Sequence, residues 1–515
     1  MRIIIFTILL FTFCVNDFAQ YDDTGKRGIY FAKKNYSPLT IPAFETSKDK
    51  LPSPVLDDNK EYIELYWKAW ELAFNHFKQP PQGSPFVSDF IDEAFSHSVF
   101  QWDTIFMIMF ARYAHFIFPS IQSLDNFYCR QYENGYICRE IQEEDGQDYV
   151  YEGREHTVNP PLFSWAELEN AKVSGDLSRI KLVLPVLEKY AEWLEKFRKK
   201  ENTKHNLYWQ TGLGSGMDNT PRSGSAWTDM SCQMVMLYND MVVMNDELGL
   251  KEKAEHFRMM AKNISSKINE LMWNEGDGLY YDLDDNGNQV KCKTIASFWP
   301  LIAGIANQQQ AEKLFYNLKD TKSFWRTIPF PSLSADHPSY KPDGQYWLGS
   351  VWAPTNVMVL KGLQKYDQFG FNEFATLAAE TYLDGIYKVY KKTGTIWENY
   401  SPDAYARGIW SKPDFVGWSG CGPIQLLIEN VIGINADGLN NKVIWNVSRI
   451  DRHGLEHLHF GNNTTSFLCN KRTDLNKTIE LTIESDNPFE LTVVRRFGEK
   501  KVLNVIKGKN IFIVE

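Results

Sequence analysis

Two carboxylates stand in short loops whose neighbouring residues suit acid–base chemistry. Asp218 lies in the stretch 216–222, GMDNTPR, and Glu398 lies in the stretch 397–402, WENYSP. Glycine and proline fix the turn of such loops, while the flanking segments hold their ends. Paired carboxyl groups hydrolyse glycosides with inversion when about 6.5 to 9.5 Å apart and with retention at roughly 5 to 5.5 Å. We therefore take Asp218 and Glu398 as the candidate catalytic pair, and these loops leave open which is the acid.

Aromatic and amide residues crowd both loops. They are Trp209, Gln210, Met217, Asn219, Arg222 and Trp227 near Asp218, and Trp397, Asn399, Tyr400 and Trp410 near Glu398. A pyranose offers an apolar C–H face to an aromatic ring and hydroxyls to amides and carboxylates. The whole chain is 14% aromatic, which fits a large helical core together with a carbohydrate cleft. The expected partner is a small carbohydrate or oligosaccharide.

Charge and hydropathy restrict the other partners. The net charge is −10 and no long Lys/Arg run is present, so nucleic acid is not expected to bind. Residues 1–19 read as an export signal, with Arg2 before an apolar core and Phe18-Ala19 before the cleavage point. No later stretch is apolar enough to span a bilayer. We expect a periplasmic or secreted protein that leaves the membrane after signal removal, and its oligomeric state stays open.

Six cysteines remain after removal of the signal, and none has CxxC spacing. This scatter argues against a zinc site, and we expect neither metal nor cofactor. Cys129 and Cys138 flank a turn-like stretch, and the sequence leaves open whether they form a disulfide or remain thiols.

Hydrophobic periodicity predicts a mainly α protein. Helix-like segments lie at 58–78, 102–117, 119–130, 161–174, 177–200, 226–248, 250–273, 294–305, 307–318, 348–367, 370–392 and 419–432. Twelve helices in consecutive pairs favour an (α/α)6 toroid barrel over an irregular bundle or a solenoid, since no fixed-period repeat is visible. The long connections, which carry most of the Gly, Pro and Trp, are expected to line a central pit.

Short alternating runs after residue 436 predict a small β-sandwich. The expected organisation is a signal peptide at 1–19, an irregular N-terminal arm at 20–57, the barrel at 58–435 and the β-sandwich at 436–515.

A series of motifs carries a family resemblance. They are QWDT at 101–104, PPLFSW at 160–165, SGMDNTPR at 215–222, YWLGSVWAPTN at 346–356 and WENY at 397–400. In this order they resemble glycoside hydrolase family 63 and its mannosylglycerate-hydrolase-like relatives in the trehalase superfamily. The resemblance implies an (α/α)6 barrel and inversion at an α-glycosidic bond. It also implies that Asp218 is the general acid and Glu398 the general base.

The same resemblance implies the substrate contacts. Trp102 and Asp103 would hold the sugar in the −1 subsite, with Trp347, Gly349, Trp352 and Asn356 on its wall. From the motifs and their loops we add Trp165, Asn219, Arg222, Trp397 and Trp418 as candidate substrate-binding residues.

The hypothesis is an exported, exo-acting, inverting α-glycosidase, similar to an α-glucosidase. One alternative is an (α/α)6-barrel sugar epimerase or lyase with a His or Tyr base, although no His lies in either carboxylate motif. The other is a catalytically silent glycan-binding protein, against which the presence of both carboxylates counts.

Overall fold

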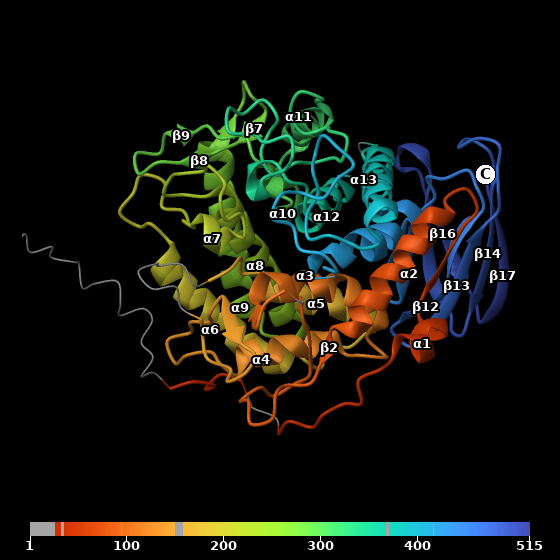
Figure 1. Ribbon diagram of the computed structural model, residues 1–515, viewed down its shortest axis with the longest axis horizontal. Helices are drawn as coiled ribbons and strands as arrows, with labels where there is room; N and C mark the ends of the chain where they lie inside the picture. The colour runs from red at the N-terminus through yellow and green to blue at the C-terminus, as the bar shows by residue number, and fades with distance from the viewer. Residues whose placement is uncertain (1–25, 32–34, 94, 150–157, 367–369, 416) are drawn as a thin grey trace, which may run out of the picture.

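The computed structural model describes residues 26–31, 35–93, 95–149, 158–366, 370–415 and 417–515. The expected signal peptide at 1–19 lies outside the described residues. Helices dominate the chain up to Ile432, and strands dominate after it. Figure 1 shows the C-terminal strands in blue at one side of the helical part.

Each of the twelve segments expected to be helical contains helix. The long α-helices are α2 (Lys60–Asn75), α3 (Gln101–Ala111), α5 (Phe163–Ser174), α6 (Ile180–Arg198), α8 (Thr228–Glu247), α9 (Lys251–Lys267), α11 (Gln308–Lys319), α12 (Ala353–Gln364) and α13 (Asn372–Thr393). The other helical segments include η4 (Ser120–Leu124), α4 (Asp125–Tyr128), α7 (Gly212–Ser215), α10 (Trp299–Ala303) and the π-helix η10 (Gly422–Ile432).

The helices differ in how much of their surface is covered. Every residue of α3 and of η10 is buried, whereas α6 and α9 bury one face and expose the other. A helix that is apolar on all sides must be enclosed by other elements, whereas an amphipathic helix covers them. The chain therefore supplies both enclosed helices and covering helices, and α3 is one of the enclosed ones.

The C-terminal strands form two sheets. The five-stranded sheet has the order β1-β12-β13-β14-β17, and the four-stranded sheet has the order β10-β11-β15-β16. Their bounds are β1 Ser53–Leu56, β10 Ile434–Asp437, β11 Lys442–Asn446, β12 His453–Phe460, β13 Asn463–Cys469, β14 Ile479–Ser485, β15 Phe489–Val494, β16 Lys500–Val505 and β17 Gly508–Val514. All pairs are antiparallel except β11 with β15.

Aromatic rings join the two sheets. Phe467 of β13 contacts Trp445 of β11 at 5.7 Å between ring centroids and Phe489 of β15 at 5.9 Å. Trp445 also donates a hydrogen bond from Nε1 to the carbonyl of Ile432, at the end of η10. The sheets thus share apolar contacts with each other and a hydrogen bond with the last helix.

The N-terminal arm is not wholly irregular, contrary to the sequence-based expectation. Its residues Ser53–Leu56 form β1, which pairs antiparallel with β12 so that Leu56 lies opposite His453. The prolines at 52 and 54 hide this strand in the sequence because proline cannot donate to a sheet ladder. An edge strand such as β1 tolerates proline where the missing N–H would face away from the partner strand.

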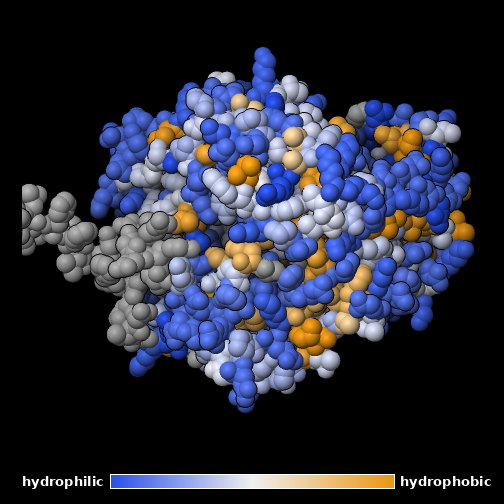
Figure 2. Space-filling model, viewed as in Figure 1, coloured by the Kyte–Doolittle hydropathy of each residue, from blue (hydrophilic) through white to orange (hydrophobic). Residues whose placement is uncertain are grey.

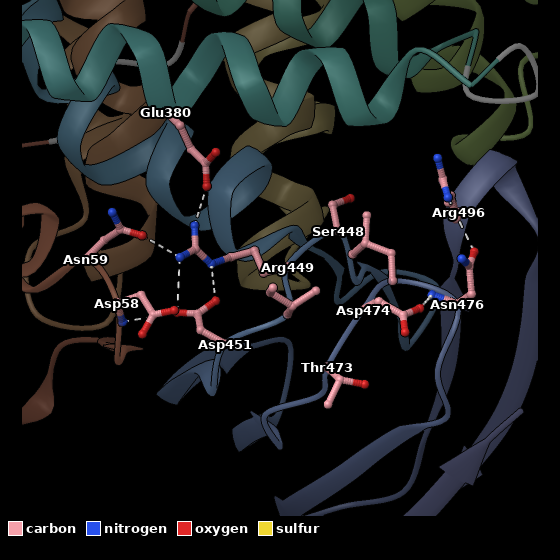
Figure 3. Close-up of a pocket in the computed structure, with 12 residues that line it drawn as sticks. Asp58, Asn59, Glu380, Ser448, Arg449, Asp451, Thr473, Asp474, Asn476 and Arg496 are labelled. Carbon is pink, nitrogen blue, oxygen red and sulfur yellow. Dashed lines mark hydrogen bonds and ion pairs between the residues drawn. The ribbon is translucent and has the colours of Figure 1, made fainter.

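A buried arginine ties the sheets to the helices (Figure 3). Arg449, which follows β11, donates to both carboxylate oxygens of Asp451, at 2.9 and 3.1 Å. It also donates to Glu380 of α13 and to Asn59, the residue before α2. Burial favours the neutral acid, but the hydrogen bonds from Arg449 hold the pKa of Asp451 below its ordinary value. One side chain therefore links two helices to the strand region.

The surface and the cysteines complete the description. One face of the molecule is mostly hydrophilic, with hydrophobic side chains gathered toward the strand side (Figure 2). Among the described residues, no helix combines the length and the apolar character needed to cross a bilayer. Cys129 and Cys138 are both buried, and the structure shows no disulfide between them, which answers the question that the sequence left open.

Candidate active site

Several loops meet at the start of α3 and enclose a cavity. Its wall carries the rings of Phe95, Phe100, Trp102, Tyr346, Trp347 and Trp418 and the polar side chains of Asp103, Arg139, Asn159 and Asp218. Glu398 lies beside this cavity, because the hydroxyl of Tyr346 donates to its Oε1 at 3.4 Å. The structure thus gathers both candidate catalytic carboxyls and Asp103, which come from distant parts of the chain.

Asp218 follows the short helix α7. Thr211 caps that helix by accepting a hydrogen bond from the backbone N–H of Gly214 at 3.1 Å, and Gly216 ends it with φ at +73°. A Cβ at position 216 would lie 3.2 Å from the ring of Trp102, so glycine also lets the loop approach this ring closely. Burial raises the pKa of Asp218 to about 6, and the charge of Arg139 opposes this rise.

Glu398 is more enclosed, with 2% of its surface exposed. Burial raises its pKa to about 7. The backbone N–H of Lys412 donates to Oε2 at 3.0 Å, and the hydroxyl of Tyr346 donates to Oε1. Both hydrogen bonds favour the ionised carboxylate and oppose the effect of burial. Glu398 therefore has two donors in place for a carboxylate although burial favours its protonated form.

Asp103, in the first turn of α3, is the third carboxyl of the cavity. Its Oδ1 is buried without a hydrogen-bond partner among the described residues. Burial raises its pKa well above the ordinary range, and the negative charges of Glu398 and Asp218 raise it further. Glu93, also fully buried, shows the same direction for the same cause, with Asp92 and Asp103 adding to it. The surroundings of Asp103 thus favour its protonated form, and its Oδ1 is an acceptor atom available for a ligand hydroxyl.

The segment 345–347 connects the loops of Asp218 and Glu398. Asn219, next to Asp218, accepts a hydrogen bond from the backbone N–H of Trp347 at 2.8 Å and donates to the carbonyl of Gln345 at 3.2 Å. Between these two residues, Tyr346 has φ at +58°, a left-handed conformation that costs energy for an aromatic residue. In this conformation, the side-chain hydroxyl of Tyr346 donates a hydrogen bond to Glu398.

A layer of indole rings supports the cavity wall. Trp347 stacks on Trp352 with ring centroids 4.1 Å apart and planes 5° apart, and Trp418 packs its edge against Trp352 at 5.6 Å. Trp418 also donates from Nε1 to the carbonyl of Glu398 at 3.0 Å. Trp347 and Trp418 line the cavity, whereas Trp352 lies behind them.

Three further candidate substrate-binding residues, of which Asn356 and Gly349 were expected on the sugar wall, lie outside the cavity lining. Asn356 donates to the carbonyls of Pro329 and Trp352, and Gly349 packs against Tyr340. Trp397 donates from Nε1 to Thr393 at 3.0 Å, and Arg407 lies over its ring. These residues hold the loops that carry the wall rather than forming the wall itself.

Arg222 and Trp165 are placed differently from the expectation that they bind substrate. The guanidinium of Arg222 is buried between Asp229 and Asp282, to which it donates at 2.6 to 2.9 Å, and it lies over the ring of Trp227. Its donors are therefore used inside the protein. Trp165 lines a different hollow, at the other end of α3.

Sequence reasoning missed Tyr346 and Arg139. Tyr346 begins the motif at 346–356, of which only the tryptophans, glycine and asparagine were selected as candidates. Its positive φ cannot be predicted from the residue types. Arg139 lies in a long connection without a chemical motif around it. Its role in lowering the pKa of Asp218 depends on a contact that only the fold creates.

The family follows from a comparison with known domains. A family model described as the mannosylglycerate hydrolase MGH1-like glycoside hydrolase domain matches residues 100–419. The chain belongs to this family. It is a glycosidase of the family 63 kind, and the matched region of this glycosidase contains Asp103, Asp218 and Glu398.

Individual relatives agree with this assignment. An uncharacterized protein of Borreliella burgdorferi is 30% identical over 410 residues, which cover 78% of this chain and 85% of that protein. The probable mannosyl-oligosaccharide glucosidase of Schizosaccharomyces pombe is 23% identical over 58% of this family 63 chain, which spans only 40% of that relative.

A solved structure shares the fold. It is the GH63 mannosylglycerate hydrolase from Thermus thermophilus in complex with glucose, with a TM-score of 0.53 and 19% identity. The match covers 70% of this chain and 99% of that one.

Proposed function

We propose that the protein is an exported, exo-acting, inverting α-glycosidase that removes a terminal α-linked glucosyl or mannosyl unit from a small carbohydrate. The observation that carries the proposal is the convergence of Asp103, Asp218 and Glu398 on one cavity walled by aromatic rings. The names of its relatives, a mannosylglycerate hydrolase and a mannosyl-oligosaccharide glucosidase, support this substrate class. We take export from the signal-like residues 1–19, which indicate a periplasmic or secreted enzyme.

The proposal includes an architecture. The helices of residues 58–435 form an (α/α)6 barrel, and the two sheets of residues 436–515 form a β-sandwich against it. The presence of both enclosed and covering helices supports the barrel, and the ring contacts between the sheets support the sandwich. In this arrangement α3 presents Asp103 at the floor of the pit.

The reaction uses Glu398 as the base and Asp218 as the acid. Glu398 acts in its ionised form, which two hydrogen-bond donors favour although its pKa of about 7 lies above that of Asp218, and it takes a proton from a water whose oxygen bonds to the anomeric carbon. The bond from that carbon to the glycosidic oxygen breaks at the same time. Asp218, with its pKa at about 6, gives its proton to the departing oxygen. Asp103 accepts a hydrogen bond from a hydroxyl of the sugar in the −1 subsite.

The runner-up chemistry, proton abstraction by a tyrosine as in an epimerase or lyase, is less favoured. Tyr346 is the hydroxyl nearest the carboxyls, and burial together with the charges of Asp218 and Glu398 raises its pKa above the ordinary value. A phenol held neutral in this way is a poor base.

The decisive experiment follows the products by proton NMR. Mannosylglycerate and nitrophenyl α-glucoside and α-mannoside are incubated with the protein, and the first anomer released is recorded. The β-anomer appearing first supports inversion, whereas the α-anomer appearing first shows retention. An epimerised or unsaturated product would overturn the glycosidase proposal. Monosaccharide as the first product from an α-linked oligomer supports exo action, and early internal fragments contradict it.

A further inference from the structure

A second hollow lies at the opposite end of α3 from the active site. Trp102, which lines the catalytic cavity, contacts Phe106 at 4.8 Å between ring centroids, and Phe106 contacts Trp165 at 5.7 Å. Trp165 is part of the wall of the second hollow, which has a volume of about 400 Å3. Phe106 of α3 therefore lies between Trp102 in the wall of the catalytic cavity and Trp165 in the wall of the second hollow.

The wall of this hollow is rich in hydrogen-bond donors. Lysines at 172, 361 and 365 come from α5 and from α12 and its end, and amides come from Asn239 of α8 and Asn372 of α13. Lys365 donates to the carbonyl of Ile302, and an ammonium group has two further N–H donors. The side chain of Lys172 is 48% exposed and pairs with Glu169 at 2.7 Å. Donors thus face the hollow from several helices.

The charges around the hollow do not cancel. Arg112, Lys172, Lys361 and Lys365 provide four cations, and Glu169, Asp240 and Glu429 provide three carboxyls. Glu169 and Glu429 are already paired with Arg112 and Lys361. Burial raises the pKa of Asp240 to about 6, so the positive excess grows as the pH falls below neutrality. This excess is local, because the protein as a whole carries a net charge of −10.

One buried amide lacks a partner. Asn372, the first residue of α13, is only 8% exposed, and its Oδ1 makes no hydrogen bond to the described residues. An unpaired buried amide oxygen costs free energy unless a ligand or water donates to it. The Oδ1 of Asn372 can therefore accept a hydrogen bond from a ligand hydroxyl, whereas the ammonium groups of the lysines can donate to a negatively charged group of the ligand. Trp165 adds an indole ring, which suits the C–H face of a sugar.

We propose that this hollow is a second binding site, which takes a small sugar derivative bearing a carboxylate or a phosphate. The ammonium groups of Lys172 and Lys365 bind the anionic group, Asn372 accepts from a hydroxyl, and Trp165 covers an apolar face. The site is distinct from the catalytic cavity because Phe106 lies between them. It does not depend on the reaction proposed above.

The test measures binding to the full-length protein by isothermal titration calorimetry. The probes are D-glucuronate, D-glucose 6-phosphate and neutral D-glucose, and the protein is the Asp218→Asn, Glu398→Gln double variant, in which turnover is blocked. We expect at least one of the anionic probes to bind at least about tenfold more tightly than glucose, since charge-assisted hydrogen bonds are the stronger ones. The tighter of the two anions identifies the anionic group.

Substitutions then locate the site. In the same background, Lys365→Met and Asn372→Ala should each weaken binding of the anionic probe about tenfold, whereas Lys262→Met, a matched change on the exposed side of α9, should leave it unchanged. Circular dichroism of each variant shows whether it is folded. The proposal is overturned if neither anion binds more tightly than glucose, or if Lys365→Met binds as the parent does. It is also overturned if Trp102→Ala, in the catalytic cavity, abolishes binding of the anion.

Discussion

The two ends of α3 bury carboxyl groups under opposite electrostatic conditions. At the first end, the pKa values of Asp103, Asp218 and Glu398 are all raised. At the last end, Glu169 and Glu429 are equally buried, yet their pKa values are lowered. Burial favours the neutral acid in all five groups. The difference shows that the number and the distance of the cationic partners decide which carboxyls stay ionised.

The cationic groups that pair with the buried carboxyls differ between the two ends of α3. Arg112 lies 2.9 Å from Glu169 and also contacts Glu429, and Lys361 lies 2.8 Å from Glu429. At the catalytic end Arg139 lowers the pKa of Asp218 and Asp103 without overcoming burial. The last end of α3, which we call the paired end, thus holds its carboxyls ionised in ion pairs. At the first end, burial favours the protonated carboxyls, as the proposed acid–base chemistry needs for its proton donor.

The largest expected effect is on turnover. Asp218→Asn and Glu398→Gln should each lower kcat by at least about a thousandfold, because in the proposed reaction each of these groups transfers a proton. Steady-state rates on a glycoside with a poor leaving group measure this loss. On a dinitrophenyl glycoside, Asp218→Asn should lose much less, since that leaving group needs no proton. Near-normal turnover of either variant on the poor substrate would remove that residue from its role.

Breaking the paired end should cost stability. Arg112→Met leaves Glu429 and Glu169 buried with fewer partners, and we expect the free energy of unfolding to fall by about 3 to 5 kcal/mol. Urea denaturation measures it. The matched control is Arg258→Met on α9, whose ion pairs are exposed and should contribute less than about 1 kcal/mol. Equal losses in the two variants would contradict the difference we draw between the ends of α3.

The catalytic end should give a narrow pH profile. With pKa values of about 6 for Asp218 and about 7 for Glu398, kcat/KM should peak near pH 6.5, whichever group is the acid. Two pH units to either side, it should be about twentyfold lower, since one group then has the wrong protonation state. The measurement is kcat/KM from pH 4.5 to 8.5 in buffers of constant ionic strength. A flat profile across this range would show that the two carboxyls do not limit the reaction.

The burial of Glu398 should also give a pH-dependent stability gain when its charge is removed. The native state holds the proton of Glu398 up to about pH 7, whereas the unfolded chain loses it near the ordinary value of 4.5. The stabilisation that the native state gains by holding this proton is thus fully present below pH 4.5 and is lost as the pH rises through about 7. Glu398→Gln should raise the free energy of unfolding by about 3 kcal/mol at pH 8 and hardly at all at pH 4.5. The same gain at both pH values would show that packing, rather than the proton, is responsible.

The paired end should respond to pH in the opposite sense. Because the pKa values of Glu169 and Glu429 are lowered, their contribution to stability is present above the ordinary value of 4.5 and is lost as the pH falls through the lowered values.

Hydrophobic periodicity predicted the helical segments of this molecule, and the motifs pointed to its candidate catalytic carboxyls. The apolar spacing in residues 62–77 predicted α2, and the loop chemistry around Asp218 and Glu398 selected two carboxyls that the fold brings to one cavity. The strand β1 was missed because prolines at 52 and 54 argue against a strand unless its place at the edge of a sheet is known. Arg222 was misjudged because Asp282, one of its two carboxylate partners, is distant in the sequence.

Side-chain direction was the other information that the sequence lacked. Trp165 belongs to the motif at 160–165, but its place on α5 turns it toward the second hollow. Tyr346 depends on a backbone conformation that its residue type disfavours.

The hydrogen bonds of Asn219 have a consequence for comparing homologous sequences. Both go to the main chain, at Gln345 and Trp347, so they do not depend on which side chains stand at those positions. Other side chains at 345 and, apart from proline, at 347 would preserve this link between the loops of Asp218 and Glu398, although Trp347 is also held by its place in the cavity wall. Methods that infer contacts from correlated substitutions would therefore find no covarying partner for Asn219, although this residue sets the spacing between the loops of Asp218 and Glu398.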